Sequence, residues 1–193
     1  MQNIVGRALL LGGCAVLLSA CQHTQRALDT VNIYTAPKPV TNTNIQIYCT
    51  GTENCEFERI NRTEIVNEST HLVNHDAIQK GYIRLKPKLT TLQANSIYLT
   101  VPAGQNEVVI RFYPISKDRA EKITVIHKFM AGHTYTFNMY RARSRGTGSL
   151  LNVSAPDPLC VALLDDKRTV RRFCKPYNVL TGLGEFAEQK TIF

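Results

Sequence analysis

The chain has 193 residues, with 23 lysines and arginines against 15 aspartates and glutamates, so its formal net charge is +8. This length fits one domain rather than several. The positive charge favours anionic partners such as lipid phosphates or acidic glycans, or alternatively a solvated basic face that aids solubility.

The first predicted element is a secretory signal over residues 1–20. Arg7 precedes an uncharged apolar stretch at 8–18, and two small residues follow before Cys21. A basic region, an apolar region and a small-residue cleavage site in this order are typical of an export signal. As a helix, the apolar stretch would span only about 16 Å, whereas the hydrocarbon core of a bilayer is about 30 Å thick. The stretch is therefore too short to be a transmembrane helix.

The run Leu17-Leu18-Ser19-Ala20-Cys21 resembles the lipobox of bacterial lipoproteins. The resemblance implies that the Cys21 thiol is joined to a diacylglycerol, that the chain is cut before Cys21, and that the new amine is acylated. Gln22 rather than an aspartate follows the cysteine, which by the family's sorting rule implies an outer-membrane lipoprotein on the periplasmic face or the cell surface. An ordinary secreted protein is the alternative. In either case, nucleic acid is not an expected partner.

Four cysteines remain once Cys14 in the signal and the lipidation site are set aside, and they predict two disulfides. An even number of thiols in an oxidising compartment is typical of a disulfide framework. The pairs closest in sequence are favoured because each closes a short loop. These pairs are Cys49–Cys55 and Cys160–Cys174. A four-cysteine zinc site is the alternative, but neither pair has the two-residue spacing of a zinc knuckle.

Residues 21–44 are predicted to form a lipidated, flexible tether. The segment is rich in Thr, Asn, Gln and Pro and has few apolar residues, which is typical of linkers. Pro37 and Pro39 argue against a continuous helix there. A single folded domain is expected over residues 45–193.

Alternating apolar and polar residues predict several short strands in this domain. The run 44–49 alternates with period two. Two later pairs of strands each flank a glycine-containing turn, which is typical of β-hairpins. These later strands are expected at 96–101 with 107–113, at 123–130 with 134–143, and at 150–153 and 159–164, with a charged turn at 165–167. Short strands at this spacing favour a mainly β fold, an antiparallel β-sandwich.

Two turns near the centre of the chain have similar patterns, Val101-Pro102-Ala103-Gly104 and Ala131-Gly132-His133-Thr134-Tyr135. On these turns, the region of about 81–143 resembles the PEGA-like small β-sandwich domains of envelope lipoproteins. The Pro-Glu-Gly-Ala motif itself is absent. Such domains share no common catalytic residues, so the resemblance implies a β-sandwich with a non-enzymatic role.

His71 and His75 are the pair of residues that most suggests a metal site. Residues 56–80 are compatible with short strands or with a short helix, and on a helix the two histidines would share a face. Leu72 stands where a metalloprotease has a glutamate after its first histidine, and surface polar histidines are the commoner explanation. No nucleophile elbow, phosphate loop or dinucleotide fingerprint occurs in the sequence. We therefore expect no catalytic residue, metal or cofactor.

Basic residues gather in the C-terminal part of the chain and form a candidate anion-binding surface. They are Arg141, Arg143, Arg145, Arg168, Arg171 and Arg172. Taken together, these observations favour a lipid-anchored lipoprotein that binds or scaffolds another component of the cell envelope without catalysis. The alternatives are a basic-surface binder of anionic glycolipid or glycan, and a metal-dependent hydrolase. The expected partners are the membrane, through the lipid, and an envelope protein or anionic glycolipid.

Overall fold

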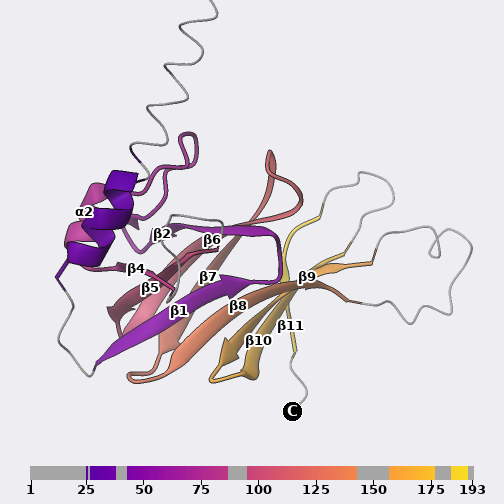
Figure 1. Ribbon diagram of the computed structural model, residues 1–193. Coiled ribbons are helices and arrows are strands. Elements are labelled where there is room, and N and C mark those ends of the chain that lie inside the picture. Colours follow the sequence, from indigo (N-terminus) through magenta and orange to yellow (C-terminus); the bar gives the residue numbers. More distant parts are fainter. Residues whose placement is uncertain are drawn as a thin grey trace, which may run out of the picture.

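The computed structural model describes residues 25, 27–37, 43–86, 95–142, 157–176 and 184–190. Over these residues the chain forms two β-sheets that pack face to face, which confirms the predicted β-sandwich (Figure 1). All strand pairs are antiparallel except that between β1 and β8.

The larger sheet has seven strands in the order β11-β10-β9-β8-β1-β5-β4, and the smaller has four in the order β3-β2-β6-β7. The strands of the larger sheet are β1 (Asn44–Thr50), β4 (Ile83–Leu85), β5 (Ile97–Pro102), β8 (Thr134–Arg141), β9 (Leu159–Asp165), β10 (Arg168–Lys175) and β11 (Ala187–Gln189). Those of the smaller sheet are β2 (Asn54–Ile60), β3 (Thr63–Glu64), β6 (Gly104–Ser116) and β7 (Arg119–Phe129). A short helix, α2 (His75–Gln79), lies between β3 and β4 in the chain.

The core fills the space between the sheets and follows from the alternation of side chains along each strand. In β1, Ile45 and Ile47 are fully buried, whereas the residues between them are partly or fully exposed. The four-stranded sheet contributes Phe57 and Phe112 to the same core, and β8 contributes Phe137. Because successive side chains of a strand point to opposite faces, one period-two pattern on each sheet is enough to build this core.

The two predicted hairpins are wrong, because each pair of strands is divided between the two sheets. β5 belongs to the seven-stranded sheet and β6 to the four-stranded one, and β7 and β8 are divided in the same way. Only Ala103 separates β5 from β6, and Gly104 has φ +122°. Turn residues indicate where a strand ends, but they do not specify whether the next strand returns to the same sheet or crosses to the facing one.

Among the hairpins that do form are β6–β7 and β9–β10. The second of these uses the charged turn expected at 165–167. Asp166 and Lys167 both have positive φ, 45° and 77°. This left-handed conformation at two successive residues is what a two-residue hairpin turn requires.

Both predicted disulfides are present and are therefore confirmed. Cys49–Cys55 joins the end of β1 to the start of β2 and so connects the two sheets. Cys160–Cys174 joins directly opposed residues of β9 and β10 within the larger sheet. Gly51, inside the first disulfide loop, packs so closely on β8 that a Cβ there would lie 1.9 Å from the Met139 carbonyl oxygen. Only glycine fits this position without a shift of the backbone.

A helix over residues 27–35 replaces part of the predicted tether. Ile33 is 2% exposed and belongs to the core cluster, and Asp29 and Thr30 are also buried. These residues therefore belong to the folded domain rather than to a flexible tether. The helix ends just before Pro37, in keeping with the exclusion of the α-conformation before a proline. Among the described residues, no helix is long and apolar enough to cross a membrane.

Candidate functional site

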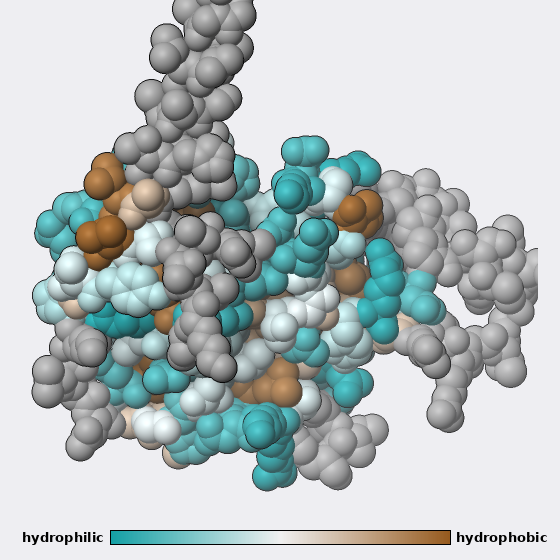
Figure 2. Space-filling model, in the orientation of Figure 1, coloured by the Kyte–Doolittle hydropathy of each residue, from teal (hydrophilic) through white to brown (hydrophobic). Residues whose placement is uncertain are grey.

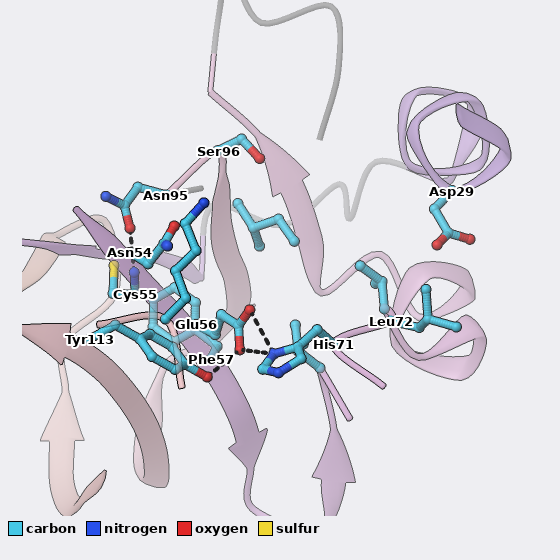
Figure 3. Close-up of a pocket in the computed structure, with 14 residues that line it drawn as sticks. Asp29, Asn54, Cys55, Glu56, Phe57, His71, Leu72, Asn95, Ser96 and Tyr113 are labelled. Carbon is cyan, nitrogen blue, oxygen red and sulfur yellow. Dashed lines mark hydrogen bonds and ion pairs between the residues drawn. The ribbon is translucent and has the colours of Figure 1, made fainter. Parts of the chain in front are cut away.

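A cavity of about 420 Å³ lies beside the first half of β2 (Figure 3). β3 pairs only with Arg59 and Ile60, so the earlier residues of β2 have no neighbouring strand on that side among the described residues. The other sides of the cavity are lined by the 66–73 segment, the start of β5 and the helix over 27–35. The lining residues are Asp29, Asn54, Cys55, Glu56, Phe57, Val66, His71, Leu72, Val73, Asn95, Ser96, Ile97, Tyr113 and Lys117.

One wall of the cavity is formed by Glu56, His71 and Tyr113, which together with the buried Arg111 make up a charged group that we call the Glu56 cluster. The Glu56 carboxylate lies 3.0 Å from His71 Nδ1 and 3.2 Å from Arg111 Nη2, and it accepts a hydrogen bond of 2.9 Å from the Tyr113 hydroxyl. Glu56 of β2 and Arg111 of β6 are directly opposed in the register. They point to the outer face of the smaller sheet, away from the core.

Arg111 is the best buried cation of the described chain, with only 1% of its surface exposed. Its Nη2 also donates to the carbonyl oxygens of Val66 and Asn67, at 3.1 and 3.3 Å. These bonds hold the 66–73 segment across the outer face of the sheet. Since burying an unpaired charge is costly, the carboxylate of Glu56 and these carbonyls make the position of Arg111 tenable.

The electrostatics of the cluster keep Tyr113 protonated. Burial, followed by the neighbouring Glu56 carboxylate, raises the pKa of Tyr113 to about 12. Both causes disfavour a second negative charge at this place. The phenol therefore remains a hydrogen-bond donor to Glu56 at neutral pH.

Asn95 closes the open edge of β2 at the other end of the cavity. Its Oδ1 accepts a hydrogen bond of 2.5 Å from the Cys55 amide, and its Nδ2 donates to the carbonyl oxygens of Thr52 and Glu53. The side chain thus satisfies an amide that a neighbouring strand would otherwise bond. Asn95 has φ 60°, a conformation that asparagine tolerates better than most residues.

Ser96 and Asp29 are polar residues of the cavity lining that are buried. Ser96 is completely buried, and its hydroxyl has no hydrogen-bond partner. Asp29 is 4% exposed, and burial is the main cause that raises the pKa of its carboxyl, against a hydrogen bond from Gln25. In Figure 3, Ser96 lies at one end of the cavity, Glu56, His71 and Tyr113 at the other, and Asp29 on the helix to the side.

This arrangement suits binding better than catalysis. Phe57, Val66 and Ile97 supply apolar walls, and a few polar groups are placed among them, as in small-ligand pockets generally. The Glu56 carboxylate is engaged by His71, Arg111 and Tyr113, and Arg111 also lies 3.7 Å from Glu58. Ser96 has no base within hydrogen-bond distance among the described residues, so nothing there activates it as a nucleophile.

His71 and His75 do not share a helix face. The helix begins at His75, and His71 precedes it with φ 55° and its Nδ1 directed at Glu56. His75 lies instead close enough to Asp29 to lower the pKa of that carboxyl, against the larger effect of burial. The two histidines were a candidate metal pair only if they shared one face of a helix, and they do not.

A different histidine lies among carboxylates. We call this group the Asp165 cluster: His133, Asp165 and Asp166. Within the described ranges, it is the one set of three or more possible ligand residues whose ligand atoms lie within 4.8 Å of one another. His133 Nδ1 is 2.7 Å from Asp165 and 3.1 Å from Asp166, and the hydrogen bond to Asp165 is the main cause that raises the pKa of His133. A hydrogen-bonded ion pair at the surface accounts for this geometry.

The candidate anion-binding arginines that the structure describes lie at two separate levels of the larger sheet. Arg141 is level with Leu159 and Lys175 in the larger sheet, whereas Arg168 is level with Asp165 and Tyr135. Six residue steps along β8, from Tyr135 to Arg141, separate these levels by about 20 Å, at ~3.3 Å per residue.

Arg171 is paired with an acid rather than free to bind an anion. It forms a two-bond ion pair with Glu188 at 2.6 and 2.7 Å. Arg172 is exposed, whereas Arg143 and Arg145 lie outside the described residues, as do Cys21 and the strand expected at 150–153.

The sequence contains one signal for the Glu56 cluster that went unused. Arg111 interrupts an apolar strand, Val108 to Phe112, and a charged residue in such a strand implies an acidic partner on the neighbouring strand. The cavity itself leaves no such signal, because it depends on how the 66–73 segment and the first helix pack. No protein-family model, curated protein or solved structure matches this chain.

Proposed function

We propose that the protein is a lipid-anchored lipoprotein of the bacterial outer membrane whose β-sandwich is a non-enzymatic binding module. The anchor rests on the lipobox-like run that ends at Cys21. The binding role rests on the cavity beside β2, with apolar walls and the unpartnered, fully buried hydroxyl of Ser96. A buried hydroxyl without a partner is unfavourable, and a bound ligand group would satisfy it.

The ligand is expected to be an envelope component with an apolar portion and at least one polar group. Val66 and Ile97 would contact the apolar portion, and Ser96 would hydrogen-bond the polar group. Lys117 lines the cavity and is exposed, so its side chain lies within reach of such a ligand. The spread of the arginines and the pairing of Arg171 do not favour the basic-surface alternative over this pocket.

Crosslinking in intact cells tests the binding role. A photoreactive residue at position 117 should capture a discrete envelope component, whereas one at the equally exposed position 167, in the β9–β10 turn, should not. Ser96→Ala keeps nearly the same volume but removes the hydroxyl, so it should reduce the capture from position 117. Identical adducts from both positions, or capture indifferent to Ser96→Ala, would contradict the proposal.

Fractionation tests the anchor independently. Cys21→Ala should leave the chain unprocessed or soluble, whereas the parent protein remains with the membranes. A variant that fractionates like the parent would show that the lipid is not what holds the protein there.

A further inference from the structure

The helix over 27–35 has two distinct faces. Asp29, Thr30 and Ile33 are buried against the domain. Leu28, Val31 and Tyr34 are 53%, 58% and 58% exposed. Spacings of three residues place these three side chains along one side of the helix, opposite the packed side.

Exposed apolar surface is concentrated on this short element. The described chain has six large hydrophobic side chains that are strongly exposed, and three of them lie on this one helix. The space-filling view shows apolar colour gathered over the helix, beside mainly polar surface (Figure 2). Single exposed apolar residues are ordinary, but an aligned set on one face is typical of a contact surface.

The position of the helix in the chain limits how far it can lie from a lipid carried by Cys21. Leu28 is seven residues from Cys21, and seven extended residues reach at most about 25 Å. If Cys21 carries the lipid, as the proposed function requires, the helix cannot leave the neighbourhood of the bilayer surface. A short helix with an apolar outer face and a tyrosine is suited to the interfacial region of a membrane.

We propose that the outer face of this helix, formed by Leu28, Val31 and Tyr34, lies in the interface of the bilayer that holds the acyl chains of Cys21. The domain is then oriented on the membrane rather than free at the end of a tether. Asp29, on the opposite face of the same helix, lines the cavity beside β2. The cavity therefore lies next to the bilayer surface.

The chain has no tryptophan, so a single introduced tryptophan reports on its own position. We compare Val31→Trp on the helix with Ile126→Trp on β7, which replace residues of similar exposure, 58% and 52%. Each variant is purified as the lipidated full chain and reconstituted in phosphatidylethanolamine–phosphatidylglycerol vesicles. Brominated lipids, which quench only from within the bilayer, and iodide, which quenches from water, then distinguish the two environments.

In the Val31→Trp variant, the tryptophan is expected to emit at shorter wavelength on vesicles and to be protected from iodide. Brominated lipid should quench it several-fold more than the tryptophan of Ile126→Trp, which should behave alike with and without vesicles. Equal access of iodide to both tryptophans, with no quenching of the helix variant by brominated lipid, would overturn the inference. Val31→Asn, combined with Leu28→Trp as the reporter, should reduce the quenching of that reporter.

The fractionation of Cys21→Ala separates this inference from the proposed anchor. If the lipidated Val31→Trp variant is on the membrane but its tryptophan remains in water, the anchor stands and the seating of the helix fails. If Cys21→Ala still fractionates with membranes, the anchor fails, whatever the tryptophan on the helix reports.

Discussion

The Glu56 cluster and the Asp165 cluster use the same pair of residue types in two different environments. In each, a histidine Nδ1 faces a carboxylate, at 3.0 Å in the first and 2.7 Å in the second. In the Glu56 cluster the carboxylate also holds a cation that is 1% exposed. In the Asp165 cluster the side chains of His133, Asp165 and Asp166 are 36%, 19% and 58% exposed, and among the described residues these carboxylates hold no buried cation.

The two histidine–carboxylate pairs are similarly exposed, so what distinguishes the clusters is the buried Arg111 that Glu56 also holds. The Glu56 carboxylate compensates a buried charge and helps to fix the 66–73 segment that encloses the cavity, so its loss should disturb both stability and the pocket. The Asp165 cluster connects the residue before β8 with the β9–β10 turn, where Asp166 also accepts a bond from the Thr134 amide. Water screens its charges, so its contribution to stability should be small but sensitive to pH.

The largest expected effect is that of removing the carboxylate from Arg111. Glu56→Ala should lower the free energy of unfolding by about 2–4 kcal/mol, because the buried guanidinium loses its closest charged partner. Asp165→Ala is the matched control and should cost much less, as the loss of a surface ion pair does. Urea unfolding of both variants at pH 7 measures the two changes. Equal losses would mean that burial does not separate the clusters.

Strand positions were largely predictable from the sequence, but the connections between strands were not. Period-two alternation placed β1, β5 and β9 nearly as observed, because each has one face in the core. Short sequence separation was enough to predict both disulfides. Sheet membership was mistaken at β5–β6 and β7–β8, since a turn's residues do not encode which sheet the next strand joins.

The first helix and the Glu56 cluster illustrate what local patterns miss. Ile33 is the one large apolar residue on the packed face of that helix, too weak a signal to distinguish it from a linker. Glu56 and Arg111 are 55 residues apart, and only the pairing of β2 with β6 brings them together. The helix and the Glu56 cluster both depend on contacts between residues far apart in the sequence. Local patterns in one sequence do not predict such contacts.

A second prediction concerns Tyr113 at alkaline pH. Its folded pKa of about 12 lies above the value near 10 of an unfolded tyrosine, so between these pH values the unfolded state loses the proton first. Stability should therefore fall as the pH rises from about 10 to about 12. Urea unfolding should show a shallower fall for Tyr113→Phe, which has no proton to lose.

The charge of Glu56 supplies a control for this interpretation. Burial is the larger cause of the raised pKa and Glu56 the second, so Glu56→Gln should lower the pKa of Tyr113 only in part. Ultraviolet absorbance of tyrosinate follows the titration, with Tyr113→Phe identifying the band. A Tyr113 that titrates near 10 in the parent protein would contradict the assigned burial and pairing.

The smallest expected effect is a difference in pKa between two histidines, His127 and His133. Both rings lie near the ring of Tyr135, with centroid distances of 5.7 Å for His127 and 6.3 Å for His133. A hydrogen bond to Asp165 raises the pKa of His133, whereas burial, followed by the charge of Arg171, lowers that of His127. Proton NMR should thus find His133 titrating above 6.5 and His127 below it. Asp165→Asn should move the pKa of His133 back toward 6.5 and should change the pKa of His127 less.

The two shifts should act on stability with opposite signs. The contribution of protonated His133 is present below about pH 6.5 and is lost as the pH rises through its raised folded pKa. His127 is favoured as the neutral ring, so its contribution is present above about pH 6.5 and is lost as the pH falls toward its lowered folded pKa. His133→Gln should therefore be more destabilising at acidic pH than at alkaline pH. His127→Gln should remove an acid-induced loss of stability, and slopes of the same sign for both variants would show that the Asp165 cluster does not hold its histidine in the charged form.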